Sequence, residues 1–482
     1  MAEVVLIYPP VKFGKHSSYG LPPLGVMYLS AFLTHHGVDS RVIDASFHPM
    51  SMAELVSRVG SHRPRLVGIS GLTPHFKTIR DLCTALRATL PKSARICLGG
   101  PHFNATSAEA FQYMDADFIV IGEGEATLLE LYGKLDEGDF SSIRGLAFKT
   151  DGQTVINAAR PLNEDLDALP RPTLEQMDTK IDYKVRHGVH PRATSLMASR
   201  GCPFRCSFCD VHTTQGRKLR LRSPEDILEE IKYNIEAFSI REFVFKDSTF
   251  TVNKRWVHDL LDRMLREKLR ISWSVNTRVN LVDSDLVEKM KQAGCRRISF
   301  GVESGEPRIL ENIRKDISLD EVRKAFAIVR RSGLESHAFF MIGNPGEGPR
   351  SAHRTIQFAK EIGPTWADFS ATVAYPGTHL FEEAVENGLL KDPLWYVEDE
   401  IEIFLTNKHS VSKGQLDLPG FSPERQVETV RKAYRQFYLR PRWIWQFALK
   451  NMNVNRVKNI LHNLGPFSRF LFQLMTRDRK GQ

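Results

Sequence analysis

The 482-residue sequence contains no run of about 18 apolar residues, so it predicts no transmembrane helix. Its six cysteines are too few for a disulfide framework in a chain of this length. No G-x-G-x-x-G motif follows the first predicted strand, which argues against a dinucleotide-binding site. Residues 1–10 hold a short apolar run and Pro-Pro without a basic start or a cleavage site, so we expect a strand there and no signal peptide.

The composition is 42% hydrophobic and 26% charged, as in soluble globular proteins. The length argues for about two to four domains, because a single core does not grow to this size. We expect domains at residues 1–145 and 191–400, a linker at 146–190 and a basic helical C-terminal region at 401–482.

Three of the cysteines lie within eight residues, in the stretch Gly-Cys-Pro-Phe-Arg-Cys-Ser-Phe-Cys that holds Cys202, Cys206 and Cys209. Thiolates select iron–sulfur clusters or zinc over hard cations. Structural zinc sites and most electron-carrying clusters have four protein ligands, so three ligands leave one metal position open to a substrate. The pattern favours an iron–sulfur cluster. A zinc site that includes His212 and a set of three unrelated buried thiols are the alternatives.

This C-x3-C-x2-C loop resembles that of the radical S-adenosylmethionine (SAM) enzymes. The resemblance implies a 4Fe–4S cluster on Cys202, Cys206 and Cys209, SAM bound at the open iron, and reductive cleavage of SAM to a 5′-deoxyadenosyl radical. The spacing alone shows only a three-thiolate site. Because oxidising surroundings destroy an open cluster, we expect a cytoplasmic protein. We interpret the other cysteines as buried small hydrophobes: Cys83, Cys97 and Cys295.

Strands and helices alternate along residues 1–145. Predicted strands lie at 4–8, 40–44, 66–70, 95–98 and 118–121, and helices at 26–35, 52–59, 78–89 and 126–134. This order predicts an α/β fold with a doubly wound, Rossmann-like parallel sheet. Such sheets bind ligands beyond the carboxyl ends of their strands.

Three loops at those ends are rich in glycine, which lets the backbone approach a ligand closely. They read Ser70-Gly71-Leu72-Thr73, Gly99-Gly100-Pro101-His102 and Gly122-Glu123-Gly124-Glu125. With these signatures, nearly all of residues 1–145 resembles the cobalamin-binding domain that precedes the radical domain in many radical SAM enzymes. The alternative is a degenerate sheet that only docks onto the rest of the chain. The resemblance implies that cobalamin contacts Ser70, Leu72, Thr73, Gly99, Gly100, His102, Gly122, Glu123, Gly124 and Glu125.

The D-x-H-x-x-G motif, which supplies a histidine ligand to cobalt in other cobalamin proteins, is missing, because Asp44-Ala45-Ser46-Phe47-His48 has the wrong spacing. By analogy, we expect the nucleotide tail of cobalamin to be detached from the metal and the lower cobalt face to have no histidine ligand. His102 is the alternative ligand, although a single loop histidine is more often a hydrogen-bonding or surface residue.

The alternation stops at residues 146–190, where Pro170 and Pro172 predict an extended connector, and it resumes in residues 191–400. Predicted strands at 193–197, 242–245, 271–275, 297–302, 335–342 and 367–373 make a partial TIM-type (β/α)6 barrel. Barrel enzymes place their chemistry at the carboxyl ends of the strands.

Polar residues follow several of these strands. The family resemblance implies that Glu303 and Ser304 contact the ribose and methionine groups of SAM, Arg278 its carboxylate, and the Gly343 segment its adenine. As alternatives, Arg278 pairs with a structural carboxylate and Gly343 belongs to an ordinary turn. Many relatives have two adjacent acids after the second strand. This chain has Lys246 and Asp247, which makes Lys246 a candidate substrate contact.

The C-terminal region is strongly basic, with thirteen Lys and Arg residues against two acids between Arg425 and Gln482. Ser422 and Pro423 predict a helix start. Basic helices with aromatics suit a membrane surface or RNA, but no RNA-binding motif is visible, and a solvated helical cap on the barrel is the third option. The aromatic residues are Phe437, Tyr438, Trp443, Trp445 and Phe447, the basic residues among them are Arg440, Arg442 and Lys450, and a second apolar run spans 467–475.

Two cofactor signatures in one chain predict a cobalamin-dependent radical SAM methyltransferase that adds a methyl group to an unactivated carbon. One alternative uses the same cofactors for cyclisation, ring contraction or oxidation, as in the branch that includes the anaerobic porphyrin cyclase. Another is a non-catalytic cobalamin-binding protein. We expect a small-molecule or lipid-like substrate and a reductant such as flavodoxin or ferredoxin. Association with a membrane surface would involve the C-terminal region.

Overall fold

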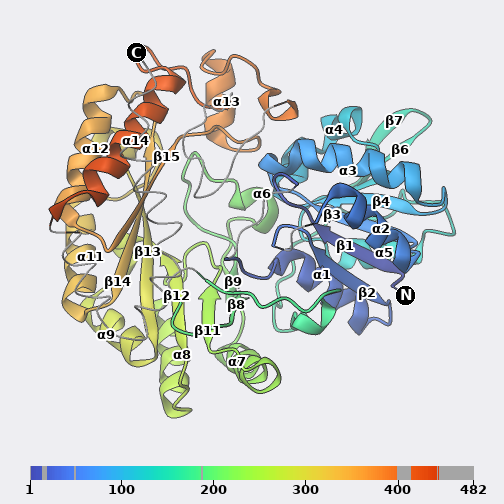
Figure 1. Ribbon diagram of the computed structural model, residues 1–482, viewed down its shortest axis with the longest axis horizontal. Coiled ribbons are helices and arrows are strands. Elements are labelled where there is room, and N and C mark those ends of the chain that lie inside the picture. The colour runs from blue at the N-terminus through green and yellow to red at the C-terminus, as the bar shows by residue number, and fades with distance from the viewer. Residues whose placement is uncertain are drawn as a thin grey trace.

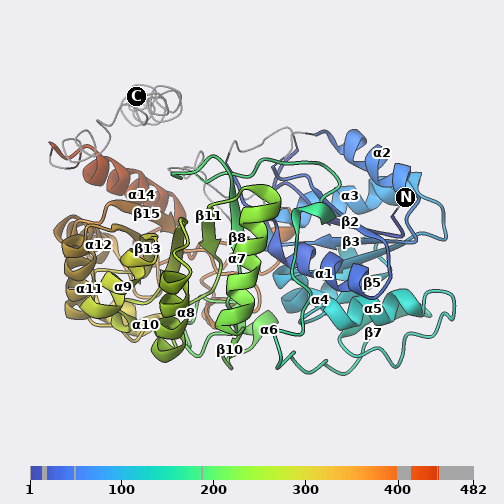
Figure 2. The ribbon, with the colours of Figure 1, turned by 90° about the horizontal axis from the view of Figure 1, so that it is seen from below.

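The computed structural model describes residues 2–13, 19–47, 50–185, 188–398, 414–441 and 443. Two α/β halves lie side by side, each built on its own sheet (Figure 1). Turned by 90°, the same two halves stay separate, with helix α7 (Pro224–Phe238) near the line where they meet (Figure 2). In the described part of the chain, no helix has the length and apolar character needed to cross a membrane.

The N-terminal sheet has seven strands in the order β2-β1-β3-β4-β5-β6-β7. Strands β1 to β5 pair in parallel, and β6 and β7 are antiparallel additions at one edge. The strands are β1 (Val4–Tyr8), β2 (Ser40–Asp44), β3 (Leu66–Ser70), β4 (Arg95–Gly99), β5 (Phe118–Val120), β6 (Leu146–Thr150) and β7 (Gln153–Ile156).

Helices cover both faces of this sheet. One face packs under α2 (Met52–His62), α3 (Phe76–Thr89) and α4 (Pro101–Tyr113), the other under α1 (Leu24–His35) and α5 (Glu125–Gly133). Strand β1 is buried on both sides, which explains its continuous apolar sequence. The predicted doubly wound sheet is confirmed.

The β6–β7 hairpin was not predicted, because residues 146–156 were assigned to the linker. Its turn holds Asp151 and Gly152, both with positive φ (49° and 76°). An Asp-Gly pair with two left-handed residues is the preferred two-residue hairpin turn. This pair is the sequence signal that could have revealed the hairpin. The domain boundaries at residues 145, 190 and 400 stay predictions.

The second sheet has six parallel strands in the order β15-β14-β13-β12-β11-β8. Among the described residues, β8 and β15 do not pair, so the predicted partial barrel is confirmed as an open one. The strands are β8 (Ala193–Leu196), β11 (Glu242–Phe245), β12 (Ser272–Thr277), β13 (Cys295–Glu303), β14 (Glu335–Ile342) and β15 (Trp366–Ala371).

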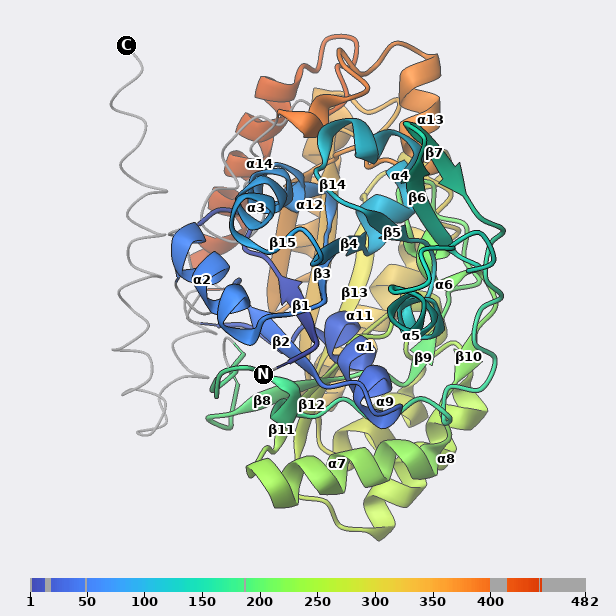
Figure 3. The ribbon, with the colours of Figure 1, turned by 90° about the vertical axis from the view of Figure 1, so that its right-hand side faces the viewer.

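Helices cover only one face of this second sheet. They are α7, α8 (Lys254–Arg266), α9 (Ser284–Gln292), α11 (Leu319–Ser332) and α12 (Pro349–Ile362). In β14, buried residues such as Ala338 and Phe340 alternate with more accessible ones such as His337 and Phe339. The accessible side, called the open face below, looks toward the N-terminal half (Figures 1 and 3).

Short elements join these layers. Strands β9 (Ser199–Arg200) and β10 (Arg220–Leu221) form a small antiparallel pair around the cysteine loop, which is followed by α6 (Val211–Gln215). The remaining elements are α10 (Pro307–Asn312), α13 (His379–Glu386), α14 (Pro423–Tyr438) and the 3-10 turns Thr73–His75, Leu174–Gln176, Val279–Leu281 and Trp395–Val397.

Helix α14 covers the outer edge of β15. The Tyr438 hydroxyl accepts a hydrogen bond from the Ala367 N–H (3.0 Å) and donates one to the Ala367 carbonyl (2.8 Å). The Tyr434 hydroxyl accepts from the Phe369 N–H (3.1 Å) and donates to an Asp368 carboxylate oxygen (3.0 Å). Two tyrosines thus satisfy backbone groups that an edge strand would otherwise expose.

This packing favours the helical cap among the three options for the C-terminal region. Phe437, Tyr438 and Trp443 are buried, and the Trp443 indole donates to the Thr365 carbonyl (3.1 Å). These three aromatics therefore serve the helical cap and are not available to a membrane surface. The other residues invoked, Arg442, Trp445, Phe447, Lys450 and the run at 467–475, lie outside the described residues.

We predict that Tyr438→Phe lowers the free energy of unfolding by about 1–3 kcal/mol, because it leaves a buried backbone N–H and C=O without partners. The midpoint of urea unfolding measures this loss. Tyr233→Phe is the matched control, since the Tyr233 hydroxyl contacts the Glu175 carboxylate at 3.3 Å in an exposed position, where water can replace a lost hydrogen bond. Equal midpoints for Tyr438→Phe and the unchanged chain would contradict the capping role.

Candidate active site

The cysteine loop begins where Gly201 leaves β9. Gly201 has a φ of +87°, and a Cβ there would lie 2.1 Å from the Lys218 carbonyl oxygen, so only glycine fits. Farther along, the Ser207 N–H donates to the Ile313 carbonyl (3.0 Å). Cys202, Cys206 and Cys209 are free and only partly buried, whereas Cys83, Cys97 and Cys295 are buried, as predicted.

The three thiols each have a different neighbour. The Cys202 sulfur lies 3.7 Å from the Thr249 hydroxyl, and the Cys206 sulfur accepts a hydrogen bond from Arg278 at 3.4 Å. Burial raises the pKa of Cys209 to about 11, and the other two cysteines add to that rise. The last effect indicates that Cys202 and Cys206 both lie near Cys209.

The described residues contain no group of three or more His, Cys, Asp or Glu side chains arranged to hold one metal ion. A structural zinc ion needs four ligands converging on one point, whereas cysteines of a 4Fe–4S cluster bind separate irons. His212, the alternative zinc ligand, hydrogen-bonds through Nδ1 to the Cys209 carbonyl (3.1 Å). Three thiolates that can each bind a separate iron are the donor set of a 4Fe–4S cluster with one open iron.

Arg278 supports this loop from the end of β12. Its guanidinium stacks over the Phe204 ring (3.9 Å to the centroid) and donates to the carbonyl oxygens of Lys315 and, at 3.2 Å, Asp316. Its partners in the described structure include no carboxylate, contrary to the alternative considered from the sequence. The buried Nε atom of Arg278 has no hydrogen-bond partner.

Glu303 and Ser304 end strand β13. Glu303 has a left-handed backbone (φ 67°), and its carboxylate pairs with the Lys315 ammonium at 2.9 Å, with both side chains buried. A Cβ on Gly301 would lie 2.3 Å from the Glu303 carboxylate, so the glycine leaves room for this pair. The Ser304 hydroxyl bonds the Thr355 hydroxyl (3.1 Å). Lys315, missed in the sequence, thus links Glu303 to Arg278.

Gly343 follows β14 with a φ of +95°. The Glu347 carboxylate accepts hydrogen bonds from the N–H groups of Gly343 (2.6 Å) and Asn344 (3.1 Å). Burial raises the pKa of Glu347 to about 7. A Cβ on Gly343 would lie 2.3 Å from the Gln426 side chain of α14. The segment is therefore a turn held by an acid and packed by the C-terminal helix.

In the N-terminal half, the glycine loops line a half-open pocket, whose empty volume of about 420 Å³ includes open solvent. Five of the residues predicted to contact cobalamin line it, namely Ser70, Gly99, Gly100, Gly122 and Gly124. The rest of the wall is mostly apolar, with Leu6, Val26, Leu29, Gly68, Ile69, Cys97, Leu98, Val120 and Leu128. Pockets of this kind suit a flat apolar group with a few polar atoms.

The other five predicted cobalamin contacts do not line this pocket. Leu72 is exposed after the end of β3. The Thr73 hydroxyl forms a hydrogen bond with Nδ1 of His102 (3.1 Å). His102 is only 2% exposed among the rings of Phe76, Phe103 and Tyr396, and burial lowers its pKa to about 3. This is the setting of a hydrogen-bonding core histidine.

Glu123 and Glu125 instead join the two halves. Arg200 of β9 pairs with Glu123 at 3.1 Å and with Glu125 at 2.6 Å, and Arg220 of β10 pairs with Glu123 at 2.9 Å. All four side chains are less than a tenth exposed. We call this group the arginine–glutamate clamp. It ties the loop after β5 to the strands on both sides of the cysteine loop.

Asn104 adds a second link between the same loops. Its carbonyl oxygen accepts from the Gly122 N–H (2.9 Å), and its amide donates to the Thr214 hydroxyl of α6 (2.8 Å). Asn104 was missed in the sequence, because the residue follows the Gly-Gly-Pro-His signature without belonging to it.

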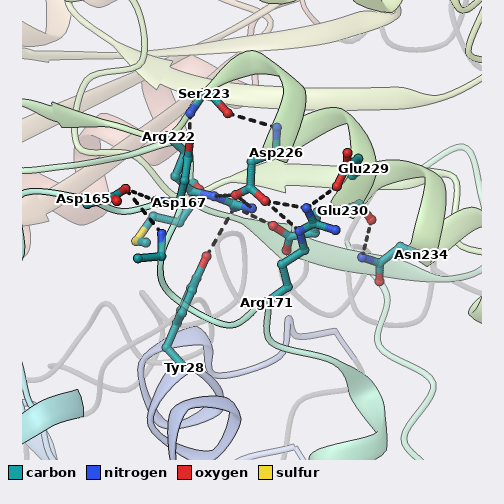
Figure 4. A network of polar contacts seen from close by, with 12 residues as sticks. Tyr28, Asp165, Asp167, Arg171, Arg222, Ser223, Asp226, Glu229, Glu230 and Asn234 are labelled. Carbon is teal, nitrogen blue, oxygen red and sulfur yellow. Dashed lines mark hydrogen bonds and ion pairs between the residues drawn. The ribbon is translucent and has the colours of Figure 1, made fainter. Parts of the chain in front are cut away.

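Figure 4 shows a third link, centred on Arg222. Its guanidinium pairs with Asp226 and Glu230 of α7 (both 2.5 Å) and contacts the Tyr28 hydroxyl of α1 (3.3 Å). Arg171 of the connector pairs with Asp226 at 2.6 Å. Buried pairs cost desolvation, but removing one partner leaves an uncompensated charge, so such networks hold elements in one arrangement.

Comparison with known proteins agrees with this geometry. The sequence profile of the Radical SAM superfamily matches residues 196–359, and that of the B12 binding domain matches residues 13–132. An uncharacterised methyltransferase of Pyrococcus horikoshii is 32% identical over 91% of this chain and 93% of its own. The anaerobic magnesium-protoporphyrin IX monomethyl ester cyclase of Rubrivivax gelatinosus is 25% identical over 91% of this chain and 77% of its own.

Among solved structures, the radical SAM methyltransferase TsrM of Kitasatospora setae, with cobalamin and a 4Fe–4S cluster bound, superposes with a TM-score of 0.66. The match has 21% identity and covers 81% of this chain and 76% of that one, which shows a shared fold. The chain belongs to the radical SAM enzymes that carry a B12-binding domain. The predicted enzyme class and the predicted cofactors, a 4Fe–4S cluster, SAM and cobalamin, are thereby confirmed.

We predict that Cys206→Ala lowers the iron content of anaerobically reconstituted protein well below the roughly four irons per chain expected of a 4Fe–4S cluster, because one thiolate ligand is lost. Iron analysis and the visible absorption spectrum measure this loss. Cys295→Ala is the control, since Cys295 is buried in β13 and forms no part of the loop. Full iron loading of Cys206→Ala would contradict the ligand assignment.

Proposed function

We propose that this enzyme transfers a methyl group to an unactivated carbon of a small-molecule substrate. The observation that carries the proposal is the arginine–glutamate clamp, in which Arg200 and Arg220 tie the glycine-loop half to the cysteine loop. A fixed junction of this kind suits a reaction that needs two cofactors at one substrate. The methyltransferase name of the Pyrococcus relative supports the same reaction.

The residues divide between the cofactors as follows. Cys202, Cys206 and Cys209 would hold the cluster, and we assign SAM to the edge formed by Arg278, Glu303, Ser304 and Gly343. The unpartnered Nε of buried Arg278 is consistent with a ligand there. When bound, the cluster and SAM supply a 5′-deoxyadenosyl radical, and cobalamin supplies the methyl group.

The residues of the protein position the cofactors and shield them from solvent. Arg278 holds Phe204 and Cys206, and its contact with the Lys315 carbonyl connects the cysteine loop to Glu303. The clamp and Asn104 hold the loops of both halves together and keep water from the buried charges. Reductive cleavage of SAM needs an electron, which a reductant such as flavodoxin or ferredoxin would provide. Membrane docking by the C-terminal region stays a prediction.

The pocket lined by the glycine loops would hold the detached nucleotide tail of cobalamin. Its wall is mostly apolar, and its glycines let the backbone lie close to a ligand. The buried position of His102 agrees with a cobalt ion without this ligand.

We predict that Leu29→Trp weakens cobalamin binding by about tenfold or more, because a larger ring fills the space that the tail would occupy. Equilibrium dialysis with hydroxocobalamin measures the affinity. Leu129→Trp is the control, since Leu129 packs against the same core cluster without lining the pocket. Equal losses in both variants would show a packing effect and contradict the assignment of the pocket.

For the reaction, we predict that reconstituted enzyme given a substrate-containing extract, reductant and SAM labelled in its methyl group forms S-adenosylhomocysteine, 5′-deoxyadenosine and a labelled carbon product. Mass spectrometry detects all three compounds. The Cys206→Ala variant controls for label transferred without the radical site. Formation of 5′-deoxyadenosine with neither S-adenosylhomocysteine nor label in the product would reject methyl transfer and favour cyclisation or oxidation, the reaction type of the Rubrivivax relative.

A further inference from the structure

Lys246 directly follows β11, at the carboxyl end of the open sheet. Its backbone N–H donates to the Leu196 carbonyl (2.8 Å), which extends the pairing of β11 with β8. The neighbouring Asp247 turns the other way and accepts hydrogen bonds from the Ala198 N–H (3.2 Å) and the Ser199 hydroxyl (2.5 Å). Two residues later, the chain reaches Thr249, which contacts the Cys202 sulfur at 3.7 Å. Lys246 therefore lies next to the cysteine loop without touching it.

The Lys246 ammonium has no hydrogen-bond or ion-pair partner among the described residues, although most other cations near the site have one. The residue is accessible to solvent, yet the surrounding protein atoms desolvate it and lower its pKa. The side chain is thus open to solvent but has protein atoms close around it. A desolvated, unpaired cation is unfavourable unless an anion joins it.

Polar residues continue from Lys246 across the open face in one row. Val244 pairs with Ser274, so the register places Lys246 beside Asn276, and the printed pairs continue from Asn276 to Ser299 and from Ser299 to His337. Asn276 is exposed, and His337 hydrogen-bonds to Asp368 at 3.0 Å. Because neighbouring strands lie about 4.8 Å apart, the row spans about 14 Å. It offers an ammonium, an amide, a hydroxyl and an imidazole.

An apolar residue lies beside this row. Phe339, two residues after His337 in β14, is 36% exposed and packs its ring against the His337 imidazole (4.4 Å between centroids). On the other face of the same sheet, Phe340 and Phe369 stack under the helices. The open face thus combines a cation at the end of β11 with an exposed aromatic ring on β14. This combination suits a molecule that has an anionic group and an apolar part.

We propose that Lys246 binds an oxyanion of the substrate, either a carboxylate or a phosphate group, at the carboxyl end of β11. This proposal rests on the proposed function, which identifies the open face as the substrate site. It adds that the substrate carries a negative charge. Asn276 donates a second hydrogen bond to the same group. Asp247, the acid next to Lys246 in the chain, is held by the Ser199 hydroxyl.

The test measures how anions protect Lys246 from acetylation. Reconstituted holoenzyme, kept anaerobic, receives a short pulse of acetic anhydride in inorganic phosphate, in acetate or in chloride at equal ionic strength, and peptide mass spectrometry quantifies each lysine. We expect phosphate or acetate to slow acetylation of Lys246 about threefold or more relative to chloride, as occupancy by the anion requires. Lys92, an exposed surface lysine, is the internal control and should not respond.

Protection by phosphate alone identifies a phosphate-type substrate, and protection by acetate alone or by both identifies a carboxylate-tolerant site. Equal rates for Lys246 in all three salts, or equal slowing of Lys246 and Lys92, would overturn the proposal. The measurement needs no turnover. If anions protect Lys246 but no methyl transfer is found, only the proposed function is wrong. If methyl transfer is found but anions do not protect Lys246, only the anion site is wrong.

Discussion

The buried contacts of Arg200 with Glu123 and Glu125 are the constraint on which the rest of the structure depends. Arg200 immediately precedes the glycine that opens the cysteine loop, and the two acids belong to a loop that lines the pocket of the other half. Removing one member of a buried pair costs about 3–5 kcal/mol, because the other charge is left without compensation. The clamp therefore joins two independently built sheets at the cysteine loop.

A second constraint acts within the open barrel. Lys315 binds Glu303 through its ammonium and Arg278 through its carbonyl, so the ends of β12 and β13 and the cysteine loop share one residue. The Gly343 segment joins this unit through α14, since Gln426 packs directly against Gly343. The strand ends assigned to SAM are thus positioned by Lys315, which follows α10, and by Gln426 of α14.

Much of this arrangement could be predicted from the sequence. Alternating apolar strands and helices specify both sheets, and the spacing of Cys202, Cys206 and Cys209 specifies a three-thiolate loop. The roles of Glu123, Glu125 and His102 could not be predicted. A glutamate in a glycine-rich loop carries no local signal for the arginine that it meets about 75 residues later, and burial of a histidine depends on tertiary packing. Lys315 and Asn104 were missed for the same reason.

Tyr434 and Tyr438 of α14 make the stability of the six-stranded sheet depend on the C-terminal helix. Strand β15 ends the barrel with its outer backbone facing Tyr434 and Tyr438, and no other described strand pairs there. A chain shortened before Pro423 would carry a bare strand able to recruit another molecule, a common origin of aggregation. Constructing a minimal catalytic fragment of this enzyme therefore requires residues up to at least Tyr438, however remote they are from the chemistry.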